Sequence, residues 1–277
     1  MRIRDIAYKR KDIAGIDLVN IVAFALAMSK EELFINAEKE IGESEVRNIE
    51  ELLKARQKGT PLAYICKEKE FFSESFFVDE RVLIPRPETE TLVEEALNLI
   101  NLKKGRLLLL DIGTGPGTIG LTIAKKTGHH VVCADISPEA LSVAKKNSLL
   151  LNVPDKAGLV CSDLFGAIRE DVGFDMILAN LPYVSSEELN ELMCDVRDFE
   201  PEIALNGGKG GFEIYERFIR MLPRYLKGNG HVLCEIGNAA QASTMQKAFE
   251  YSGLNVIIKS DLSGKSRVVI GSWINLS

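Results

Sequence analysis

The chain has 277 residues, of which 46% are hydrophobic and 27% are charged, and its formal net charge is −6. This length exceeds what one small core needs and suits one large domain with a smaller one. The acidic balance argues against binding that depends mainly on neutralising phosphates, so we expect no stable nucleic-acid binding.

The five cysteines show no paired short spacing, so neither a zinc site nor a disulfide framework is indicated. No apolar run approaches the roughly 20 residues that span a bilayer. The first dozen residues mix acidic and basic side chains instead of forming a signal sequence. We therefore expect reduced thiols, no metal, no membrane association and a cytoplasmic location.

The first 62 residues have the apolar spacing of a small helical domain. Leu18, Ile21 and Val22 recur at helical intervals, and the pattern breaks near Ser29 and Gly42. Residues 63–85 differ, because phenylalanines flank the polar segment 73–75 on both sides. We predict a small helical domain over 1–62 and a β-hairpin connector over 63–85.

Residues 86–277 begin with a helix that starts at Glu88-Thr89-Glu90 and runs to about residue 101. Further helices are predicted near 118–127, 138–151, 212–227 and 239–252, and strands near 107–112, 131–135, 158–161, 175–179, 231–236, 255–259 and 267–271. This alternation predicts an α/β fold whose sheet is mostly parallel and covered on both faces. The last two strands have no helix between them and should form an antiparallel pair. Ligands are expected outside the carboxyl ends of the strands.

A glycine loop follows the first of these strands, in the segment Asp111-Ile112-Gly113-Thr114-Gly115-Pro116-Gly117. Its G-x-G-x-G spacing differs from the G-x-G-x-x-G of dinucleotide enzymes. The glycines let a ligand approach the backbone closely, and their spacing is not one that cradles a pyrophosphate. The loop therefore suits a ligand that carries a carboxylate and a ribose, as S-adenosylmethionine does. For the loop alone, a tight turn in any α/β domain is an equal alternative.

Two carboxylates at successive strand ends favour the ligand. Asp135 ends the second strand, where it can accept hydrogen bonds from both ribose hydroxyls, and Asp163 follows the third, placed to meet an adenine amino group. The candidate cofactor-binding residues are Asp111, Gly113, Thr114, Gly115, Gly117, Asp135, Ile136, Asp163, Leu164 and Asn180.

The segment Asn180-Leu181-Pro182-Tyr183 ends the fourth strand, next to the first, where the strand order should reverse. The Asn180 side-chain oxygen and the Leu181 carbonyl can each accept one N–H of an acceptor NH2 group. Pro182 pushes Leu181 toward extended geometry, and the Tyr183 ring could pack on a planar acceptor. We predict that these four residues are catalytic, although Asn and Pro also favour ordinary turns.

No general base is indicated. The histidines, His129, His130 and His231, lie just before or at the start of predicted strands, where surface or strand-edge positions are expected. An amide need not lose its proton before methyl transfer, because the proton becomes acidic afterwards and water can take it. The absence of a base is compatible with methyl transfer and weighs against hydrolysis.

A family resemblance covers most of the chain. It is carried by the segments 81–90 (Arg-Val-Leu-Ile-Pro-Arg-Pro-Glu-Thr-Glu), 111–117, 180–183, 199–201 with 204–205, 235–237 and 261–264 with 267–269. In that order they resemble the release factor glutamine methyltransferases of the HemK/PrmC type. The Pro-Arg-Pro-Glu-Thr-Glu block is the specific part, because the glycine loop and the Asn-Pro pair also occur in nucleic-acid methyltransferases.

The resemblance implies a class I S-adenosylmethionine-dependent methyltransferase fold over 86–277, Rossmann-like with about seven strands. It also implies that the helical N-terminal domain over 1–62 is a substrate-recognition domain that helps grip the release factor. The implied acceptor is the glutamine of the Gly-Gly-Gln tripeptide of class I peptide chain release factors. Arg86 and Glu88 join Asn180, Leu181, Pro182 and Tyr183 as candidate substrate-binding residues. For Arg86 and Glu88 a plain helix start with dipole-matched acids is an equal alternative.

The chain departs from the family pattern at three positions. Leu181 replaces the usual Pro, which keeps the carbonyl and costs about 0.4 to 1 kcal/mol of chain stiffness at most. Pro116 stands where Ser is more common and removes one backbone donor, and Lys67 stands where Gly is usual. None of these changes removes a group that methyl transfer requires.

We therefore predict a protein-glutamine N-methyltransferase that acts in translation termination. One alternative is an adenine methyltransferase acting on DNA or RNA, which would use the same geometry on a flipped base. A non-catalytic S-adenosylmethionine-binding module is the other alternative.

Overall fold

The computed structural model describes residues 1–9 and 13–273, which divide into two compact units. The smaller unit contains residues 1–68 and 193–199, and the larger one contains residues 69–192 and 200–277. The division is discontinuous in sequence, because a short stretch after residue 192 belongs with the N-terminal unit.

The smaller unit is helical, as its apolar spacing predicts. Its helices are α1 (Ile3–Lys9), α2 (Gly15–Ala25), α3 (Lys30–Ile35), α4 (Glu43–Gln57), α5 (Leu62–Cys66) and the short α9 (Cys194–Arg197). Ser29 begins α3 with a capping box, in which its hydroxyl accepts from Glu32 N and the Glu32 carboxylate accepts from Ser29 N. Ile21, Ile49 and Leu53 are almost fully buried in the core of this unit.

The larger unit contains a seven-stranded sheet of order β5-β4-β3-β6-β7-β9-β8. The strands are β3 (Leu108–Ile112), β4 (His130–Asp135), β5 (Ala157–Cys161), β6 (Phe174–Ala179), β7 (Leu226–Glu235), β8 (Asn255–Ser260) and β9 (Ser266–Ser272). The first five run parallel, and β9 lies antiparallel between β7 and β8. The predicted mostly parallel sheet and its terminal antiparallel pair are confirmed.

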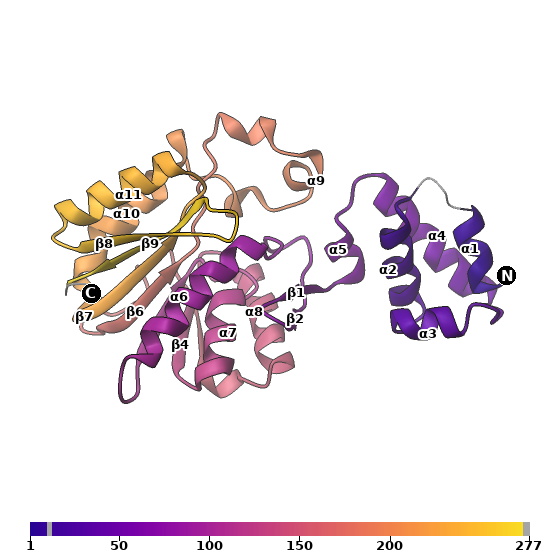
Figure 1. Cartoon of the computed structure of the whole chain (residues 1–277), viewed down its shortest axis with the longest axis horizontal. Helices are drawn as coiled ribbons and strands as arrows, with labels where there is room; N and C mark the ends of the chain where they lie inside the picture. Colours follow the sequence, from indigo (N-terminus) through magenta and orange to yellow (C-terminus); the bar gives the residue numbers. More distant parts are fainter. Residues whose placement is uncertain (10–12, 274–277) are drawn as a thin grey trace. The chain divides into compact units, whose positions relative to one another are not determined.

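Helices cover both faces of this sheet (Figure 1). They are α6 (Glu90–Asn101), α7 (Thr118–Thr127), α8 (Pro138–Leu150), α10 (Glu213–Met221) and α11 (Ala239–Tyr251). Alternate residues of β6 serve different cores, because Ile177 packs in the cluster that contains α10 and α11, whereas Met176 packs in the one that contains α6 and α7. Because successive side chains point to opposite faces and both faces are buried, β6 is hydrophobic along almost its whole length, as is typical of a parallel strand.

The predicted hairpin is present in the larger unit, as β1 (Lys69–Phe71) paired antiparallel with β2 (Glu74–Phe76). Phe71 and Phe76 are buried and meet edge to face, with ring centroids 6.1 Å apart. Phe72 N donates to the Glu90 carboxylate at 2.8 Å, which ties the hairpin to the first residue of α6. The hairpin therefore supports the segment that enters the site.

The structure differs from the sequence prediction between residues 212 and 231. The helix α10 ends at Met221, a 3-10 turn spans Leu222–Arg224, and β7 begins at residue 226. Pro223 lacks the N–H that a continuing helix needs, which accounts for the early end. His231 consequently lies inside β7 and is 5% exposed, so the surface or edge position expected for it is wrong.

Short 3-10 turns lie between several of these elements. They are η1 (Pro87–Thr89), η2 (Pro154–Lys156), η3 (Glu188–Glu191), η4 (Glu202–Ala204), η5 (Lys209–Gly211) and η6 (Leu222–Arg224). Across residues 1–9 and 13–273, no helix is both long enough and apolar enough to cross a membrane.

Candidate active site

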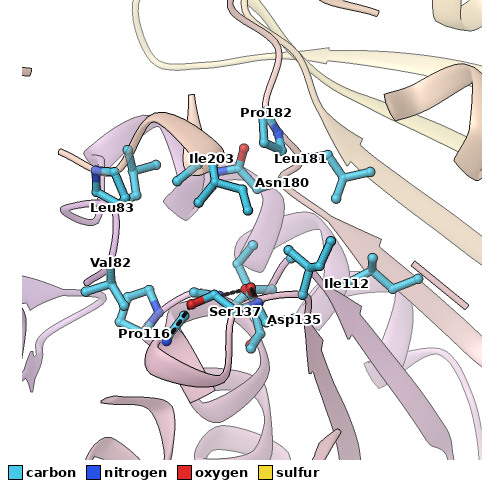
Figure 2. Close-up of a pocket in the computed structure, with 18 of the residues that line it drawn as sticks. Val82, Leu83, Ile112, Pro116, Asp135, Ser137, Asn180, Leu181, Pro182 and Ile203 are labelled. Carbon is cyan, nitrogen blue, oxygen red and sulfur yellow. Dashed lines mark hydrogen bonds between the residues drawn. The ribbon is translucent and has the colours of Figure 1, made fainter. Parts of the chain in front are cut away.

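A pocket opens at the carboxyl ends of the parallel strands, where the loops after β3, β4, β5 and β6 meet (Figure 2). The strands β3 and β6 are adjacent, although α7, β4, α8 and β5 intervene in sequence. The strand order therefore reverses between them, and that switch point is where α/β sheets bind ligands. In Figure 2, Asp135, Ser137 and Pro116 lie on one side of the pocket, and Asn180, Pro182 and Ile203 lie on the other.

The glycine loop takes a conformation that glycine favours. Gly113, Gly115 and Gly117 have φ values of +72°, +54° and +88°. A Cβ atom on Gly117 would lie 2.5 Å from Leu121 Cδ1, so this position excludes a side chain sterically as well as conformationally. Gly113 and Gly115 line the pocket with Thr114, whereas Gly117 lies behind it at the start of α7.

Asp111 holds the loop from behind and does not line the pocket. Its Oδ2 accepts hydrogen bonds from Thr114 Oγ1 at 2.6 Å and from Gly120 N at 2.9 Å. Burial raises the pKa of this fully buried carboxyl to about 6, while those hydrogen bonds lower it. Its place is therefore structural: it joins the loop to the first turn of α7.

Asp135 faces the pocket from the end of β4. Its Oδ2 accepts from Gly115 N at 2.8 Å and its Oδ1 accepts from Ser137 N at 2.9 Å. Burial raises the pKa of Asp135, and these backbone donors lower it. The carboxylate is thus fixed in direction, and its remaining acceptor capacity is available to hydroxyl groups of a ligand. Ile136, half exposed, lines the same side.

Asp163 lines the pocket but is already engaged. Its Oδ2 lies 2.6 Å from Arg217 Nη2, a residue of α10 that the sequence analysis did not single out. Both side chains are about half exposed, at 50% and 53%. A purine amino group would therefore share this carboxylate with Arg217. Leu164, next in the chain, is buried with φ +50° and lines the pocket.

Asn180 follows the last residue of β6 and lines the pocket. Its Nδ2 donates to Thr89 Oγ1 at 3.2 Å. Leu181 N donates at 3.2 Å to the hydroxyl of Tyr215, which is fully buried. The strand end is therefore held by a side-chain contact and by a backbone contact.

Tyr183 and Glu88 do not line the pocket. The Tyr183 hydroxyl lies 3.5 Å from Glu235 Oε1, and its ring packs where a Cβ on Gly237 would approach within 2.9 Å. Burial raises the pKa of Tyr183 to about 12, so the hydroxyl stays protonated. Glu88 is exposed in η1. Of the candidate substrate residues, the pocket brings together Arg86, Asn180, Leu181 and Pro182.

Glu200 fixes the segment that carries Arg86. Its Oε1 lies 2.5 Å from Arg86 Nη2 and its Oε2 accepts from Ile84 N at 3.0 Å, while the Glu200 side chain is 1% exposed. This ion pair clamps the Pro-Arg-Pro turn against the residues that precede η4. Because Pro201 and Ile203 line the pocket next to Glu200, the same clamp shapes the acceptor side.

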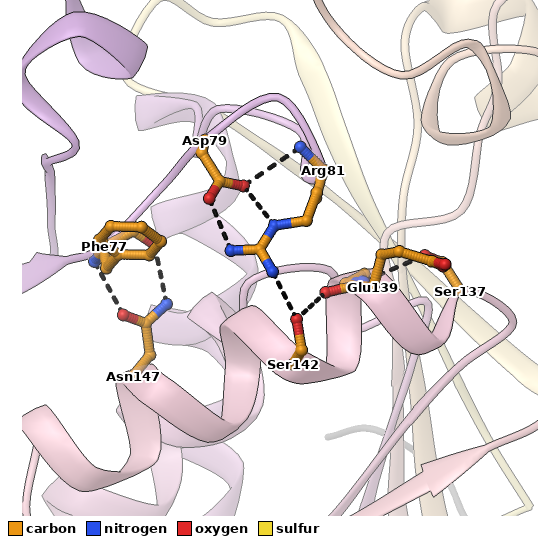
Figure 3. Close-up of polar contacts among 8 residues, drawn as sticks. Phe77, Asp79, Arg81, Ser137, Glu139, Ser142 and Asn147 are labelled. Atoms are coloured by element: carbon orange, nitrogen blue, oxygen red, sulfur yellow. Dashed lines mark hydrogen bonds and ion pairs between the residues drawn. The ribbon is translucent and has the colours of Figure 1, made fainter.

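A second clamp lies on the donor side, around Asn147 of α8 (Figure 3). The buried Asn147 amide donates to Pro116 O at 2.8 Å and to Phe77 O at 3.0 Å, and accepts from Phe77 N at 2.7 Å. It therefore joins the glycine loop to the chain after the hairpin. Nearby, Arg81 Nε and Nη2 donate to the two carboxylate oxygens of Asp79, and Arg81 Nη1 donates to Ser142 Oγ. No local motif signals the contacts of Asn147, because they join residues 31 and 70 positions apart in sequence.

The titratable groups that line the pocket are carboxylates and guanidinium groups. Among the described residues, no group of three or more His, Cys, Asp or Glu side chains is arranged to hold a metal ion. No histidine lines the pocket. Its polar lining combines the carboxylates of Asp135 and Asp163, the Asn180 amide and the guanidinium groups of Arg81, Arg86 and Arg217.

Two family models match the chain. The model described as the methyltransferase small domain matches residues 89–196, and the PrmC N-terminal domain matches residues 9–66.

Curated relatives are similar over nearly the whole chain. The release factor glutamine methyltransferase of Clostridium acetobutylicum is 36% identical over 254 residues, covering 90% of this chain and 88% of the relative. That of Rhodopirellula baltica is 37% identical over 269 residues, covering 94% and 90%.

A solved structure of the hMettl16 catalytic domain in complex with MAT2A 3'UTR hairpin 6 aligns with a TM-score of 0.60. It is 16% identical, and the alignment covers 74% of this chain and 77% of that one. This likeness supports the fold of the sheet and its helices.

Proposed function

Because the chain belongs to the release factor glutamine methyltransferase family, we propose that it methylates the glutamine of the Gly-Gly-Gln tripeptide of class I peptide chain release factors. The methyl donor is S-adenosylmethionine, the acceptor atom is the side-chain amide nitrogen, and the reaction takes place in the cytoplasm. The observation that carries the proposal is the Asn180 side chain, which lines the pocket at the end of β6 and whose Nδ2 donates to Thr89 Oγ1.

The donor side of the pocket fits S-adenosylmethionine. Asp135 offers a fixed carboxylate for ribose hydroxyls, and Gly113 and Gly115 let the backbone approach the ligand. Asp163 would accept from the adenine amino group while it keeps Arg217 as a neighbour. When bound, the donor supplies an electrophilic methyl group on a sulfonium ion, and no metal is needed for that chemistry.

The acceptor side fits a primary amide. Two acceptors, Asn180 Oδ1 and the Leu181 carbonyl, would each take one N–H of the glutamine side chain. This holds the nitrogen with its lone pair toward the methyl group and stabilises the positive charge that develops on it. The nitrogen–carbon bond forms as the carbon–sulfur bond breaks, and the extra proton on nitrogen then leaves to water. We assign Arg86 and Pro182 to the rim of this side.

The smaller unit is proposed to select the release factor. Its match to the PrmC N-terminal domain supports this assignment, as does its own buried core around Ile21, Ile49 and Leu53. A separately packed unit can recognise a protein substrate without altering the pocket that performs the chemistry. We expect no stable nucleic-acid or membrane partner.

The test compares acceptors under one set of conditions. The protein is incubated with S-adenosylmethionine carrying a labelled methyl group and with a class I release factor, its Gln→Ala tripeptide variant, or RNA and DNA. Label on the intact release factor alone is the expected result. Label on nucleic acid, with none on the release factor, would overturn the proposal in favour of an adenine methyltransferase. Donor binding without transfer to any acceptor would favour a non-catalytic module.

A further inference from the structure

We propose that Tyr215 is a positioning residue, whose buried hydroxyl fixes the peptide between Asn180 and Leu181 and so sets the direction of the Leu181 carbonyl. The inference rests on the proposed function and deepens it, because that carbonyl is one of the two acceptors assigned to the glutamine NH2 group. Tyr215 does not itself line the pocket, and it lies 34 positions after Leu181 in the sequence.

Tyr215 is held rigidly in the core of the larger unit. It belongs to α10 and is fully buried. Its ring meets Phe218 edge to face, with centroids 6.3 Å apart, and its centroid lies 5.8 Å from that of Phe212. Close-packed neighbours leave a buried ring few alternative positions. The hydroxyl therefore stays where the structure places it, beside the last residues of β6 and β7.

The direction of each hydrogen bond at this hydroxyl follows from its partner. A backbone N–H can only donate, so the Tyr215 oxygen accepts from Leu181 N, at 3.2 Å. A backbone carbonyl can only accept, so the hydroxyl proton points to the Glu235 carbonyl oxygen at 2.6 Å, which is nearer than the Ala179 carbonyl oxygen at 3.4 Å. Burial raises the pKa of Tyr215 well above its usual value, so the hydroxyl keeps its proton. The Leu181 N–H therefore has a fixed acceptor.

The geometry of the chain carries this fixed position on to the Leu181 carbonyl. The peptide between Asn180 and Leu181 is planar, so only the φ and ψ angles of Leu181 separate the anchored N–H from the carbonyl. Pro182 favours extended backbone at Leu181, with ψ of about +120 to +160°. The Leu181 side chain also lies against the glycine loop, because a Cβ on Gly113 would lie 3.0 Å from Leu181 Cδ2. The carbonyl is therefore oriented before the acceptor binds.

The test is a double-mutant cycle between residues 215 and 181. Tyr215→Phe keeps the ring and removes the hydroxyl, but it also removes the hydrogen bond to the Glu235 carbonyl. Leu181→Pro separates the two losses, because proline has no N–H to donate. With Leu at 181 we expect Tyr215→Phe to lower kcat on the order of 10-fold, with the KM for S-adenosylmethionine within about 2-fold.

In the Leu181→Pro background, Tyr215→Phe should change kcat by less than about 2-fold, because no N–H is left for the hydroxyl to hold. An equal loss in both backgrounds would show that the hydroxyl acts through the Glu235 carbonyl or through packing, and would overturn the inference. An unchanged kcat when Tyr215→Phe is made with Leu at 181 would overturn it as well.

Tyr225 offers a matched control. It is 3% exposed, its hydroxyl donates to the Ile168 carbonyl oxygen at 3.3 Å, and it does not line the pocket. Tyr225→Phe therefore removes a hydroxyl of the same kind from the same core. We expect its kcat to stay within about 2-fold of the unmodified protein. A loss as large as that of Tyr215→Phe would trace both effects to the core and contradict the positioning role.

Hydrogen exchange of the Leu181 backbone amide, followed by nitrogen-15 NMR, gives a measurement that does not depend on activity. Relative to the amides of β6, exchange should be slow in the unmodified protein and in Tyr225→Phe, and at least about 10-fold faster in Tyr215→Phe. An unchanged ratio in Tyr215→Phe overturns the inference, even if Leu181→Pro does not fold. If the ratio changes as expected while no release factor is methylated, the proposed substrate fails and the anchoring of Leu181 stands.

Discussion

The two sides of the pocket are built by different means. The donor side is a backbone structure, in which glycines with positive φ close on Asp135 and the buried Asp111 and Asn147 hold the loop from behind. The acceptor side depends on side chains from distant segments, since Asn180 Nδ2 donates to Thr89 Oγ1 and Leu181 N donates to the Tyr215 hydroxyl. A backbone site is specified by local residue types, whereas a side-chain site is specified by tertiary contacts. Substitutions on the two sides should therefore affect different properties: turnover on the acceptor side, and donor affinity or stability on the donor side.

The largest effect is expected from Asn180→Ala, which removes one acceptor for the glutamine NH2. We expect kcat to fall by about 10²- to 10³-fold, by analogy with the removal of one positioned hydrogen-bonding group from an active site. The affinity for S-adenosylhomocysteine, measured by calorimetry, should change less than about 3-fold, because Asp135 and the glycine loop are intact. An equal loss of donor affinity would show that the two sides are not separate.

On the donor side, a substitution that disturbs the backbone of the glycine loop should destabilise the protein. Gly117→Ala tests this expectation. The substitution would place an L-residue at φ +88°, and its Cβ would lie 2.5 Å from Leu121 Cδ1. We expect the free energy of unfolding to fall by about 2 to 4 kcal/mol, measured by urea denaturation. Gly128 at the other end of α7 is the matched control, because its φ is +71° but nothing lies within 4 Å of its Cβ position. Gly128→Ala should cost about 1 kcal/mol; equal losses would exclude the steric contact.

Asp135→Ala should weaken donor binding without removing the chemistry. The carboxylate is proposed to hold ribose hydroxyls, and a hydrogen bond to a charged group contributes about 1.5 to 3 kcal/mol. We therefore expect the Kd for S-adenosylhomocysteine to rise by about 10- to 100-fold. At saturating donor, kcat should stay within a few-fold. A collapse of kcat with unchanged affinity would place Asp135 on the acceptor side instead.

The smallest effect is a pH dependence of stability from Glu235. Its pKa in the folded protein is raised from 4.5 to about 7, so the folded state binds its proton at higher pH than the unfolded state does. Its contribution to stability is present below about pH 4.5 and is lost as pH rises through 7. Glu235→Gln should therefore be more stable than the unmodified protein at pH 8, by on the order of 1 to 3 kcal/mol. The difference should vanish near pH 5; a difference that does not vary with pH would contradict the burial argument.

The same contrast explains what could be predicted from sequence. The strand order around β3 and β6 followed from the alternation of apolar runs, and the glycine loop followed from residue types that only a tight turn requires. Asn180 could be selected because Asn followed by X-Pro-Tyr at a strand end is a local pattern. In each case the information lies within a few neighbouring residues.

Local sequence could not predict the tertiary contacts of four other residues of the site, Thr89, Asn147, Arg217 and Glu200. Asn147 joins Pro116 and Phe77 across 31 and 70 positions, and Glu200 reaches Ile84 across 116. The segments 81–90 and 199–201 carry the family resemblance, but the local sequence does not show which residues Thr89 and Glu200 contact. Tyr183 shows the reverse case, since a motif position drew attention to a side chain that the fold turns toward Glu235.

The most direct measurement is a fragment mass spectrum of the Gly-Gly-Gln peptide of a release factor. The release factor is first incubated with S-adenosylmethionine and with either the unmodified protein or its Asn180→Ala variant. The account predicts the added mass of one methyl group on the glutamine side chain with the unmodified protein, and almost none with the variant. A methyl group on any other residue, or equal methylation by the variant, would contradict it.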